Sequence, residues 1–517
     1  MITQSIGGIM SISILHRHLA AFAGAVAATF VFCQVSEASY GLYVGKNRTA
    51  DGSVFLGGTG EEVSSHWLRI EPRKKHAPGE TISVGVTKEA VMPGEMMEIP
   101  QVGETAAFIS MDYSDYEGFP PPLTNGGLNE YGVAVRDIWS PSRKELIAMT
   151  PNPQKGPQYS DLARIALERA KTAREAVQVI GDLINQYGYS DYGGNSHLIA
   201  DANEGWVVIN FSGGKGLWVA ERLGPDDVRM SYPGYIGEIP LDYQTNQDFM
   251  GSANLISFAA EQGWYEPGQP FDVHKVYGDQ TAPMRSPGVE YMESKLQNLG
   301  AKVTLREFMD AVRDPVISDD AAGYGQVAQL KEGVRNEMQL LWVAPTSSVT
   351  APFIPWRIGV GEIPAEYRWH RYMTKGAASN YLTAEYAQQE ATEYAFYLYK
   401  RLLYYTCSRL DEFYDEVVGT LTAFENHMID DQAWVEQSAE GMFERGESDS
   451  AKRLITYYSS VQAMRALDLG NALLGSMEQR TKLLQGIPQP PSNETMKLEY
   501  NMIRCGPTPE SLASTPQ

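Results

Sequence analysis

Ser39 is the residue with the clearest chemical potential in this sequence, because the residues before it predict that it becomes the first residue of the mature chain. Arg17 precedes an apolar run from Leu19 to Val35, and Ser36-Glu37-Ala38 follows. A positive start, an apolar stretch and small residues at positions −3 and −1 are typical of a secretory signal cut after Ala38. The run is shorter than the roughly 20 residues of a membrane-spanning helix, which favours cleavage over a stable anchor.

A cut at this point would leave Ser39 with both a hydroxyl group and a free α-amine. Because an α-amine titrates near pH 8, it can take the proton of the neighbouring hydroxyl at neutral pH. One residue then supplies a nucleophile and its base, which suits hydrolysis of an amide through an acyl-enzyme. Serine after a cleavage site is also ordinary in exported proteins, so the assignment depends on the residues that follow.

Those residues include Val44-Gly45-Lys46 and Asp51-Gly52-Ser53, in a pattern that predicts a strand, a tight turn and a second strand. This start resembles that of the PepD-like dipeptidases (the dipeptidase A family), which are N-terminal nucleophile hydrolases. In that family a nucleophilic cysteine stands five residues before the Val-Gly-Lys, and Ser39 holds its place here. Cys33 lies earlier, inside the predicted signal.

Three later segments extend the resemblance over roughly residues 39–365. They are Gly127-Leu128-Asn129-Glu130-Tyr131-Gly132-Val133-Ala134, Gly194-Asn195-Ser196-His197-Leu198-Ile199-Ala200-Asp201 with Glu204-Gly205-Trp206, and Leu255-Ile256-Ser257-Phe258-Ala259 with Gly263-Trp264-Tyr265. Their order along the chain is that of the family. The sequence departs from the family at Ser39 and at Gly58, where the family has an arginine that helps to orient the nucleophile.

The resemblance also suggests which residues would assist Ser39. A tetrahedral oxyanion needs preorganised donors, and the amides of Asn195 and Asn129 are the candidates. The ammonium group of a dipeptide needs a carboxylate, for which Glu61 and Glu62 are the candidates, and its terminal carboxylate would meet Arg136.

The predicted fold is α+β. From Val44 to Val135 short apolar runs alternate with turn residues, two helices are predicted over Ser160–Tyr187, and Thr304-Leu305-Arg306-Glu307 is a capping box that opens another helix. The four-layer αββα sandwich of N-terminal nucleophile hydrolases is implied by the resemblance. The expected segments are a signal (1–38), a catalytic core (39–365), a helical C-terminal region packed on the core (366–485) and a Pro-containing tail (486–517).

Composition limits the partners of the chain. Removal of residues 1–38 takes away one arginine and one glutamate, so the formal net charge stays at −22. A surface this acidic repels nucleic acid, and the sequence has no nucleic-acid motif. No metal or cofactor motif is present, so none is implied. Cys407 and Cys505 either pair in an oxidising compartment or remain thiols.

These observations predict an exported (periplasmic or extracellular) dipeptidase that is matured by signal peptidase and acts on dipeptides through Ser39. Two alternatives stay open. One is an acylase for N-acyl amides of the penicillin or bile-salt type, and the other is a non-catalytic binding homologue, suggested by Gly58. The sequence does not decide whether the helical region forms a homo-oligomer or covers the site.

Overall fold

The computed structural model describes residues 39–61, 66–113, 118–299, 301–369, 392–486 and 503–507, all within one compact unit. The predicted signal, residues 1–38, lies outside the described residues. Across the described ranges, none of the helices combines the length and the apolar character needed to cross a membrane.

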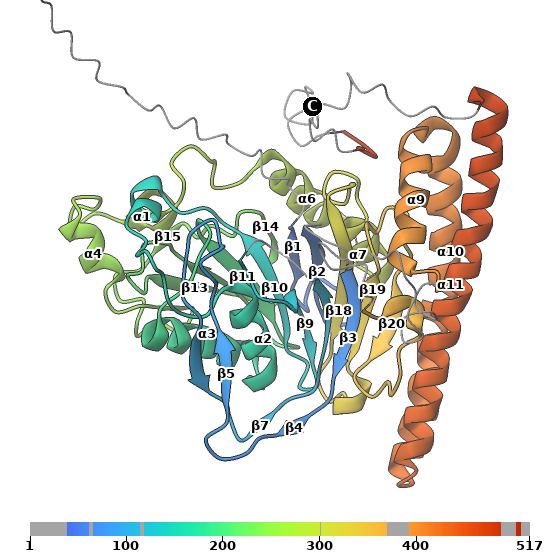
Figure 1. The fold of residues 1–517 in the computed structure, drawn as a ribbon, viewed down its shortest axis with the longest axis horizontal. Helices are drawn as coiled ribbons and strands as arrows, with labels where there is room; N and C mark the ends of the chain where they lie inside the picture. The colour runs from blue at the N-terminus through green and yellow to red at the C-terminus, as the bar shows by residue number, and fades with distance from the viewer. Residues whose placement is uncertain are drawn as a thin grey trace, which may run out of the picture. The chain divides into compact units, whose positions relative to one another are not determined.

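Two antiparallel sheets form the centre of the fold (Figure 1). The six-stranded sheet has the order β14 (Val228–Ser231), β1 (Gly41–Val44), β2 (Val54–Glu61), β18 (Ala322–Leu330), β19 (Leu340–Ala344) and β20 (Ile354–Arg357). The eight-stranded sheet has the order β16 (Phe249–Gly251), β13 (Trp218–Leu223), β12 (Gly205–Asn210), β11 (Asn195–Ala200), β10 (Ala134–Trp139), β9 (Leu123–Asn129), β8 (Phe108–Tyr113) and β3 (His66–Glu71).

Smaller strand pairs and helices complete the described part of the chain. The pairs are β4 (Lys74–Lys75) with β7 (Glu104–Thr105), β5 (Thr81–Val84) with β6 (Met97–Pro100), and β15 (Glu238–Ile239) with β17 (Phe271–Asp272). The helices are α1 (Lys144–Ala148), α2 (Tyr159–Arg169), α3 (Ala173–Tyr187), α4 (Leu255–Glu261), α5 (Val273–Tyr277), α6 (Pro287–Gln297), α7 (Leu305–Val312), η1 (Asn336–Met338), η2 (Ala365–Tyr367), α9 (Ala395–Cys407), α10 (Leu410–Glu444) and α11 (Ser448–Gln485).

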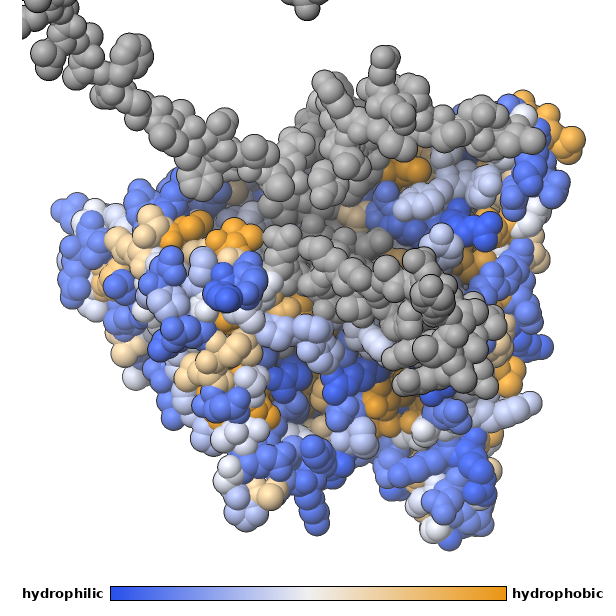
Figure 2. Space-filling model, viewed as in Figure 1, coloured by the Kyte–Doolittle hydropathy of each residue, from blue (hydrophilic) through white to orange (hydrophobic). Residues whose placement is uncertain are grey.

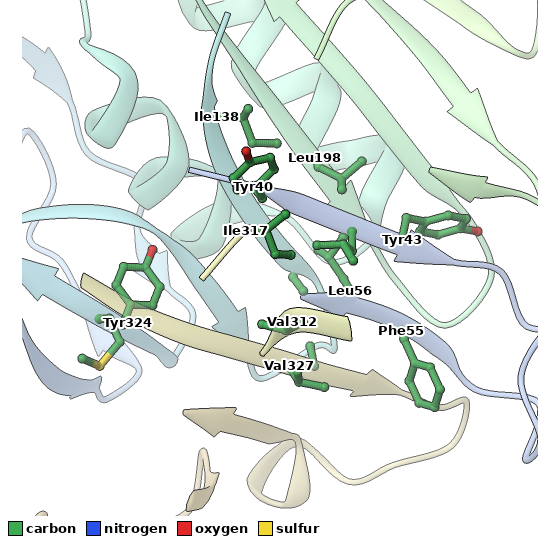
Figure 3. Packing of buried hydrophobic residues seen from close by; sticks show 14 of the residues in the cluster. Tyr40, Tyr43, Phe55, Leu56, Ile138, Leu198, Val312, Ile317, Tyr324 and Val327 are labelled. Atoms are coloured by element: carbon green, nitrogen blue, oxygen red, sulfur yellow. The ribbon is translucent and has the colours of Figure 1, made fainter. Parts of the chain in front are cut away.

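Alternating side chains bind the two sheets face to face. Ile138 on β10 and Leu198 on β11 are fully buried and share one apolar cluster with Leu56 on β2, as Figure 3 shows. A strand presents successive residues to opposite faces. Accordingly, Val135 and Ile199 on these same strands belong to a second cluster, on the face away from the six-stranded sheet.

Helices cover both outer faces. Helices α2 and α3 supply many residues of the second cluster, and Phe308 on α7 packs on Phe55 of β2 with ring centroids 5.2 Å apart. The layers therefore follow the order α, β, β, α, and the predicted four-layer sandwich is confirmed. The two helices predicted over Ser160–Tyr187 are α2 and α3, and Thr304 and Glu307 form the predicted capping box of α7.

The C-terminal helices α9, α10 and α11 lie side by side and pack against β20 at the edge of the six-stranded sheet (Figure 1). The helical character predicted for 366–485 is found from Ala395 onward, and 370–391 lies outside the described residues. On the described part of the face in Figure 2, polar residues are interspersed with separate patches of hydrophobic residues.

A buried carboxylate fixes α10 to the sandwich. Glu425 is fully buried and accepts hydrogen bonds from both terminal nitrogens of Arg313, from Arg306 Nη1 at 2.6 Å and from the Phe353 backbone N–H at 2.8 Å. Burial alone would raise the pKa of Glu425, but Arg313 and Arg306 outweigh burial and lower it. Arg313 and Arg306 belong to the α7 segment, so this network connects the helical region to the outer face of the six-stranded sheet.

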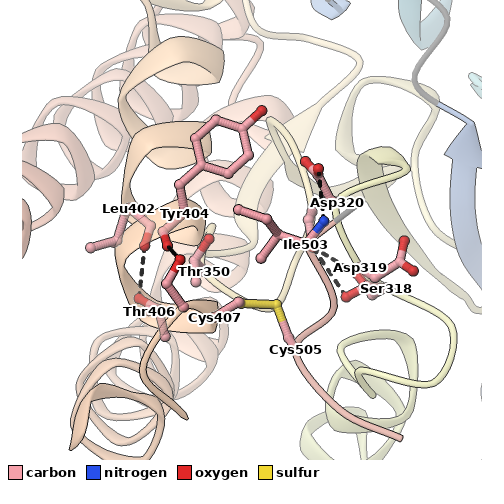
Figure 4. Close-up of a disulfide and its surroundings, with 12 residues drawn as sticks. Ser318, Asp319, Asp320, Thr350, Leu402, Tyr404, Thr406, Cys407, Ile503 and Cys505 are labelled. Atoms are coloured by element: carbon pink, nitrogen blue, oxygen red, sulfur yellow. Dashed lines mark hydrogen bonds between the residues drawn. A yellow bond between two sulfur atoms is a disulfide. The ribbon is translucent and has the colours of Figure 1, made fainter. Parts of the chain in front are cut away.

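A disulfide makes a second connection. Cys407, the last residue of α9, is bonded to Cys505, 98 residues further along the chain (Figure 4). Next to it, the Ile503 N–H donates to Asp320 at 3.3 Å and Arg504 pairs with Asp319 at 3.5 Å. The described piece of the tail, residues 503–507, is thereby held on the loop between α7 and β18.

Replacing Glu425 tests how strongly the helical region is fixed. Glu425→Gln leaves the Arg313 guanidinium buried without its counter-charge, so we expect the free energy of unfolding to fall by about 3–5 kcal/mol at pH 7. Denaturant unfolding would measure the loss. The matched control is Glu416→Gln, which removes the surface pair with Arg480 and should cost less than about 1 kcal/mol. Equal losses in the two variants would contradict this role of Glu425.

Candidate active site

Ser39 lies two residues before β1, the second strand of the six-stranded sheet, and only 6% of it is exposed. Gly41, two residues on, faces the eight-stranded sheet, because a Cβ there would lie 2.7 Å from Ile138 Cδ1 and 3.0 Å from Leu198 Cδ2. Strand alternation places Ser39 on the same face as Gly41. The predicted nucleophile thus stands just before the N-terminal end of an interior strand, between the two sheets.

The β1–β2 ladder ends at Tyr40 in an irregular way. Thr59 N–H donates to the Tyr40 carbonyl at 3.0 Å, as in a regular hydrogen-bonded pair. The Tyr40 N–H, however, donates to the Thr59 hydroxyl at 3.4 Å. The Thr59 carbonyl accepts instead from Arg136 Nη2 at 2.5 Å. A side chain from the opposite sheet therefore occupies the last acceptor of the ladder, one residue from Ser39.

Arg136 is part of the interior. It is 2% exposed, and its Nη1 donates to the Tyr324 hydroxyl at 2.7 Å and to Gln326 Oε1 at 2.9 Å. Its guanidinium carbon also lies 5.0 Å from the centre of the Tyr324 ring. All of these partners are neutral groups of the protein. The sequence predicted that Arg136 meets the carboxylate of a substrate, whereas the structure commits its two terminal nitrogens to β2 and β18.

The backbone at position 58 of β2 leaves no room for a side chain, which explains why a glycine and not an arginine stands there. The φ of Gly58 is +149°, which side chains rarely adopt, and a Cβ would lie 1.8 Å from the Tyr40 carbonyl oxygen. Gly58 pairs with Gly41 on one side and with Gln326 on the other. The space between the sheets beside Gly58 is filled by Arg136, which bonds to Gln326.

The two predicted oxyanion donors lie elsewhere. Asn195 Nδ2 donates to Asp137 Oδ1 at 2.6 Å, and by alternation both side chains lie on the helix-covered face of the eight-stranded sheet, opposite Ser39. Asn129 Nδ2 donates to the carbonyls of Leu167 and Ala170 at 2.9 and 2.7 Å, so it terminates α2. The structure brings neither asparagine to Ser39.

Two serines that the sequence reasoning missed lie on the face of the eight-stranded sheet that Ser39 faces. Ser196 shares that face with Leu198, and its Oγ lies 2.7 Å from Ser140 Oγ. Ser140 Oγ also accepts from the Gly234 N–H at 2.8 Å. Ile138 and Leu198 face Gly41, and Ser140 and Ser196 lie two residues from them on the same two chain segments. The two hydroxyls are therefore on the side of these residues that is nearer to Ser39. The signal was available in the alternation of Ser196 with Leu198.

The remaining predicted residues are on β2 and just after it. Glu61 is the last residue of β2, where it pairs with Ala322 on β18, and only its backbone is described. Glu62 lies outside the described residues. The backbone of Glu61 is thus near the Ser39 end of the sheet, since Gly41 pairs with Gly58 and the Tyr40 carbonyl accepts from the Thr59 N–H.

A buried acid on the opposite face was also missed. Asp137 accepts from Asn195 and from Asn125 Nδ2 at 3.0 Å, and His197 Nε2 lies 3.7 Å from it. Burial raises the pKa of Asp137 to about 7, although the two amides and Arg136 act against the rise. Burial lowers the pKa of His197 to about 4. This network packs under α2, where the Tyr159 carbonyl contacts His197 at 3.2 Å.

Substitution of Gly58 tests the close packing at the end of the ladder. Gly58→Ala should lower the free energy of unfolding by about 3 kcal/mol or more, because its Cβ meets the Tyr40 backbone. Gly52→Ala is the matched control, with φ +76° and no atom within 4 Å of its Cβ, and it should cost about 1–2 kcal/mol from backbone strain alone. Equal costs in chemical denaturation would refute the close approach.

Asp137 should make stability depend on pH. A carboxyl group whose pKa is raised on folding contributes stability below its unfolded pKa near 4, and that contribution is lost as pH rises to about 7. The unfolding free energy of the wild type minus that of Asp137→Asn should therefore fall by on the order of 4 kcal/mol between pH 4 and pH 7. The exposed Asp226→Asn is the control. A difference that stays flat across this range would exclude the raised pKa.

Comparisons with known proteins agree with the resemblance seen in the sequence. A "Probable dipeptidase" of Salmonella dublin is 27% identical over 244 residues, which cover 46% of this chain and 52% of that protein. A "Probable dipeptidase B" of Streptococcus pyogenes serotype M3 is 27% identical over 258 residues, 48% of each chain. This chain spans about half the length of the curated relatives it matches.

Solved structures of conjugated bile acid hydrolase variants from Clostridium perfringens are 10% and 11% identical, with a TM-score of 0.29, and cover 62% of this chain and 92% of theirs. The four-layer order is established by the strand pairing and packing of this chain, and not by these solved structures. Residues 39–287 match peptidase family C69, and the match begins at Ser39. Over these residues the chain is similar to peptidase family C69.

Proposed function

We propose that this protein is an exported dipeptidase whose mature chain begins at Ser39 and uses that residue as its nucleophile. The observation that carries the proposal is the position of Ser39, just before an interior strand between two sheets, at the residue where the family match begins. The names of the relatives support the dipeptide as substrate.

In the proposed reaction, Ser39 Oγ attacks the carbonyl carbon of the peptide bond while the α-amine of Ser39 takes the hydroxyl proton. The same amine then gives that proton to the leaving amino group as the C–N bond breaks, which leaves an ester on Oγ. Water attacks the ester, its proton passes through the amine to Oγ, and the free acid departs. The α-amine is thus base and acid in turn.

Donors for the oxyanion have to come from groups near the Ser39 end of the sheets. The hydroxyls of Ser140 and Ser196 replace Asn195 and Asn129 in this proposal, because they lie on the face that Ser39 faces. One hydroxyl donates to the other, and the second can donate to the Ile138 carbonyl at 3.3–3.4 Å, an acceptor that it would exchange for the oxyanion. Loss of one such donor typically slows the chemical step by about 10²–10³-fold.

The ammonium group of the dipeptide remains assigned to Glu61 or Glu62, as the sequence suggested. The backbone of Glu61 at the end of β2 supports this placement. The carboxylate of the dipeptide has no assigned partner, since Arg136 bonds to the protein. If Glu61 holds the ammonium group, Glu61→Gln raises KM for dipeptides and leaves KM for their N-acetyl forms unaffected.

The experiment begins with N-terminal sequencing of the protein exported by its native route, followed by kinetics on dipeptides and N-acyl amides. We expect a chain that starts at Ser39 and hydrolyses dipeptides. Ser39→Ala should lower kcat by on the order of 10⁴-fold or more, whereas Ser39→Cys retains a nucleophile and activity. Ser83→Ala, at an exposed strand position, is the matched control.

Each contrary outcome selects one alternative. Hydrolysis of N-acyl amides without dipeptides identifies an acylase. Dipeptide binding without turnover, unaffected by Ser39→Ala, identifies a binding homologue. A chain that starts upstream or downstream of residue 39 removes the amine from the hydroxyl and contradicts the mechanism.

A further inference from the structure

We propose that Arg136 is a positioning residue for Ser39. The buried charge of the Arg136 guanidinium keeps the α-amine of Ser39 in its free-base form at neutral pH. This inference rests on the proposed function and goes beyond it, because it assigns the source of the charge that tunes the N-terminal amine. That charge reaches Ser39 from the opposite sheet.

Arg136 is connected to the neighbour of Ser39 through the β1–β2 ladder. Arg136 Nη2 binds the Thr59 carbonyl, and Thr59 is the residue hydrogen-bonded with Tyr40, the neighbour of Ser39. One residue spans 3.8 Å between Cα atoms, so the guanidinium and the amine are separated by on the order of 10 Å or less.

Within the described residues Arg136 bonds to no acid, although its charge acts against the raised pKa of the neighbouring Asp137. In the described part of the chain the Arg136 side chain forms no ion pair, and the groups that its terminal nitrogens bind are a carbonyl, a phenol and a carboxamide. Asp137 is adjacent in sequence but points to the other face of the sheet, where it binds Asn125 and Asn195. A positive charge in a buried site disfavours protonation of a nearby amine.

Ionisable residues on the elements next to β1 define the background against which Arg136 acts. Tyr324 faces the same space from β18, and burial raises its pKa, so it is neutral at pH 7. The further groups on the neighbouring elements are Glu61 on β2, Tyr232 after β14, Arg285 and Glu293 at α6, and Asp319 and Asp320 on the loop before β18.

Arg136 also determines where the β1–β2 ladder ends. Arg136 Nη2 occupies an acceptor that would otherwise bind the Tyr40 N–H, so the ladder stops at Tyr40. The strand end that carries Ser39 is thus defined by the same guanidinium that supplies the charge. A neutral side chain of similar length at position 136 would lose both effects, whereas lysine would keep the charge and lose the forked contact with Thr59, Tyr324 and Gln326.

The test measures titration of the N-terminal amine directly. The exported protein carrying Ser39→Ala has an amine at position 39 and no hydroxyl to react, and acetic anhydride labelling from pH 5 to 9, read by mass spectrometry, gives the fraction of free amine. We expect labelling at pH 6.5 to be about tenfold faster than for an ordinary α-amine with the same reactivity at high pH, and Arg136→Gln to remove this advantage.

Kinetics on the Ser39 protein supply a second readout. The ratio of kcat/KM at pH 6.5 to that at pH 9 should fall about tenfold in Arg136→Gln and be restored in Arg136→Lys. Arg73→Gln, at a half-exposed arginine distant from β1 in the sequence and on the β4 side, is the matched control and should leave the ratio unchanged. Thermal unfolding identifies any variant that fails to fold.

The outcomes separate this inference from the proposed function. If the chain starts at Ser39 and is active, but its amine titrates like an ordinary α-amine, the inference is overturned while the dipeptidase proposal stands. The same holds if Arg136→Gln changes only KM, which would return Arg136 to substrate binding. The wild-type amine titration alone decides the matter if no Arg136 variant folds. A mature chain that starts elsewhere overturns both.

Discussion

A guanidinium buried between two β-sheets is the interaction on which the arrangement around Ser39 depends. Arg136 crosses from the eight-stranded sheet to bind β2 and β18 at the point where β1 begins. A buried charge is tolerated only where hydrogen bonds replace its hydration. The contacts with Thr59, Tyr324 and Gln326 supply these bonds to the two terminal nitrogens, and they join the two sheets at this end.

The glycines of β2 make this crossing sterically feasible. Gly58 has no side chain to place in the space between the sheets, and its backbone approaches Tyr40 so closely that none could be added. The Tyr324 ring similarly covers Gly60, where a Cβ would lie 2.4 Å from the ring. In this chain, therefore, the cation between the sheets comes from β10, and β2 provides the room for it.

The C-terminal helices are joined to the same sheet from its outer side. Glu425 binds the arginines of the α7 segment, and α7 packs on β2 through Phe308 and Phe55. The disulfide from Cys407 to Cys505 holds the described tail on the loop that follows α7. That loop reaches the ladder end as well, because the Ile317 carbonyl accepts from the Thr59 hydroxyl at 3.4 Å. Helix α7 and the loop that follows it therefore contact both the helical region and the strand end next to Ser39.

The sequence predicted the elements well where local patterns determine them. Helix periodicity and capping placed α2, α3 and α7. The four layers followed from the resemblance, since several α/β arrangements would bury these elements equally well.

The sequence predicted the site less well, because the face to which a strand residue points depends on register. Asn195 and Ser196 are neighbours, and a shift of one residue exchanges the two faces of the sheet. The asparagine was chosen for its chemistry and bonds to Asp137, whereas the serine bonds to Ser140 on the other face of the sheet. Arg136 was placed in the right region but given an external partner. Its internal partners are contributed by β2 and β18, far away in the sequence, and no local pattern could reveal them.

The most direct test of the account is to trap the acyl-enzyme. The exported protein would be treated with an activated ester of an amino acid, digested, and its N-terminal peptide analysed by tandem mass spectrometry. The account predicts an aminoacyl ester on a peptide that begins at Ser39, absent in Ser39→Ala. Turnover of dipeptides by a chain whose Ser39 remains unmodified, or is preceded by Ala38, would contradict it.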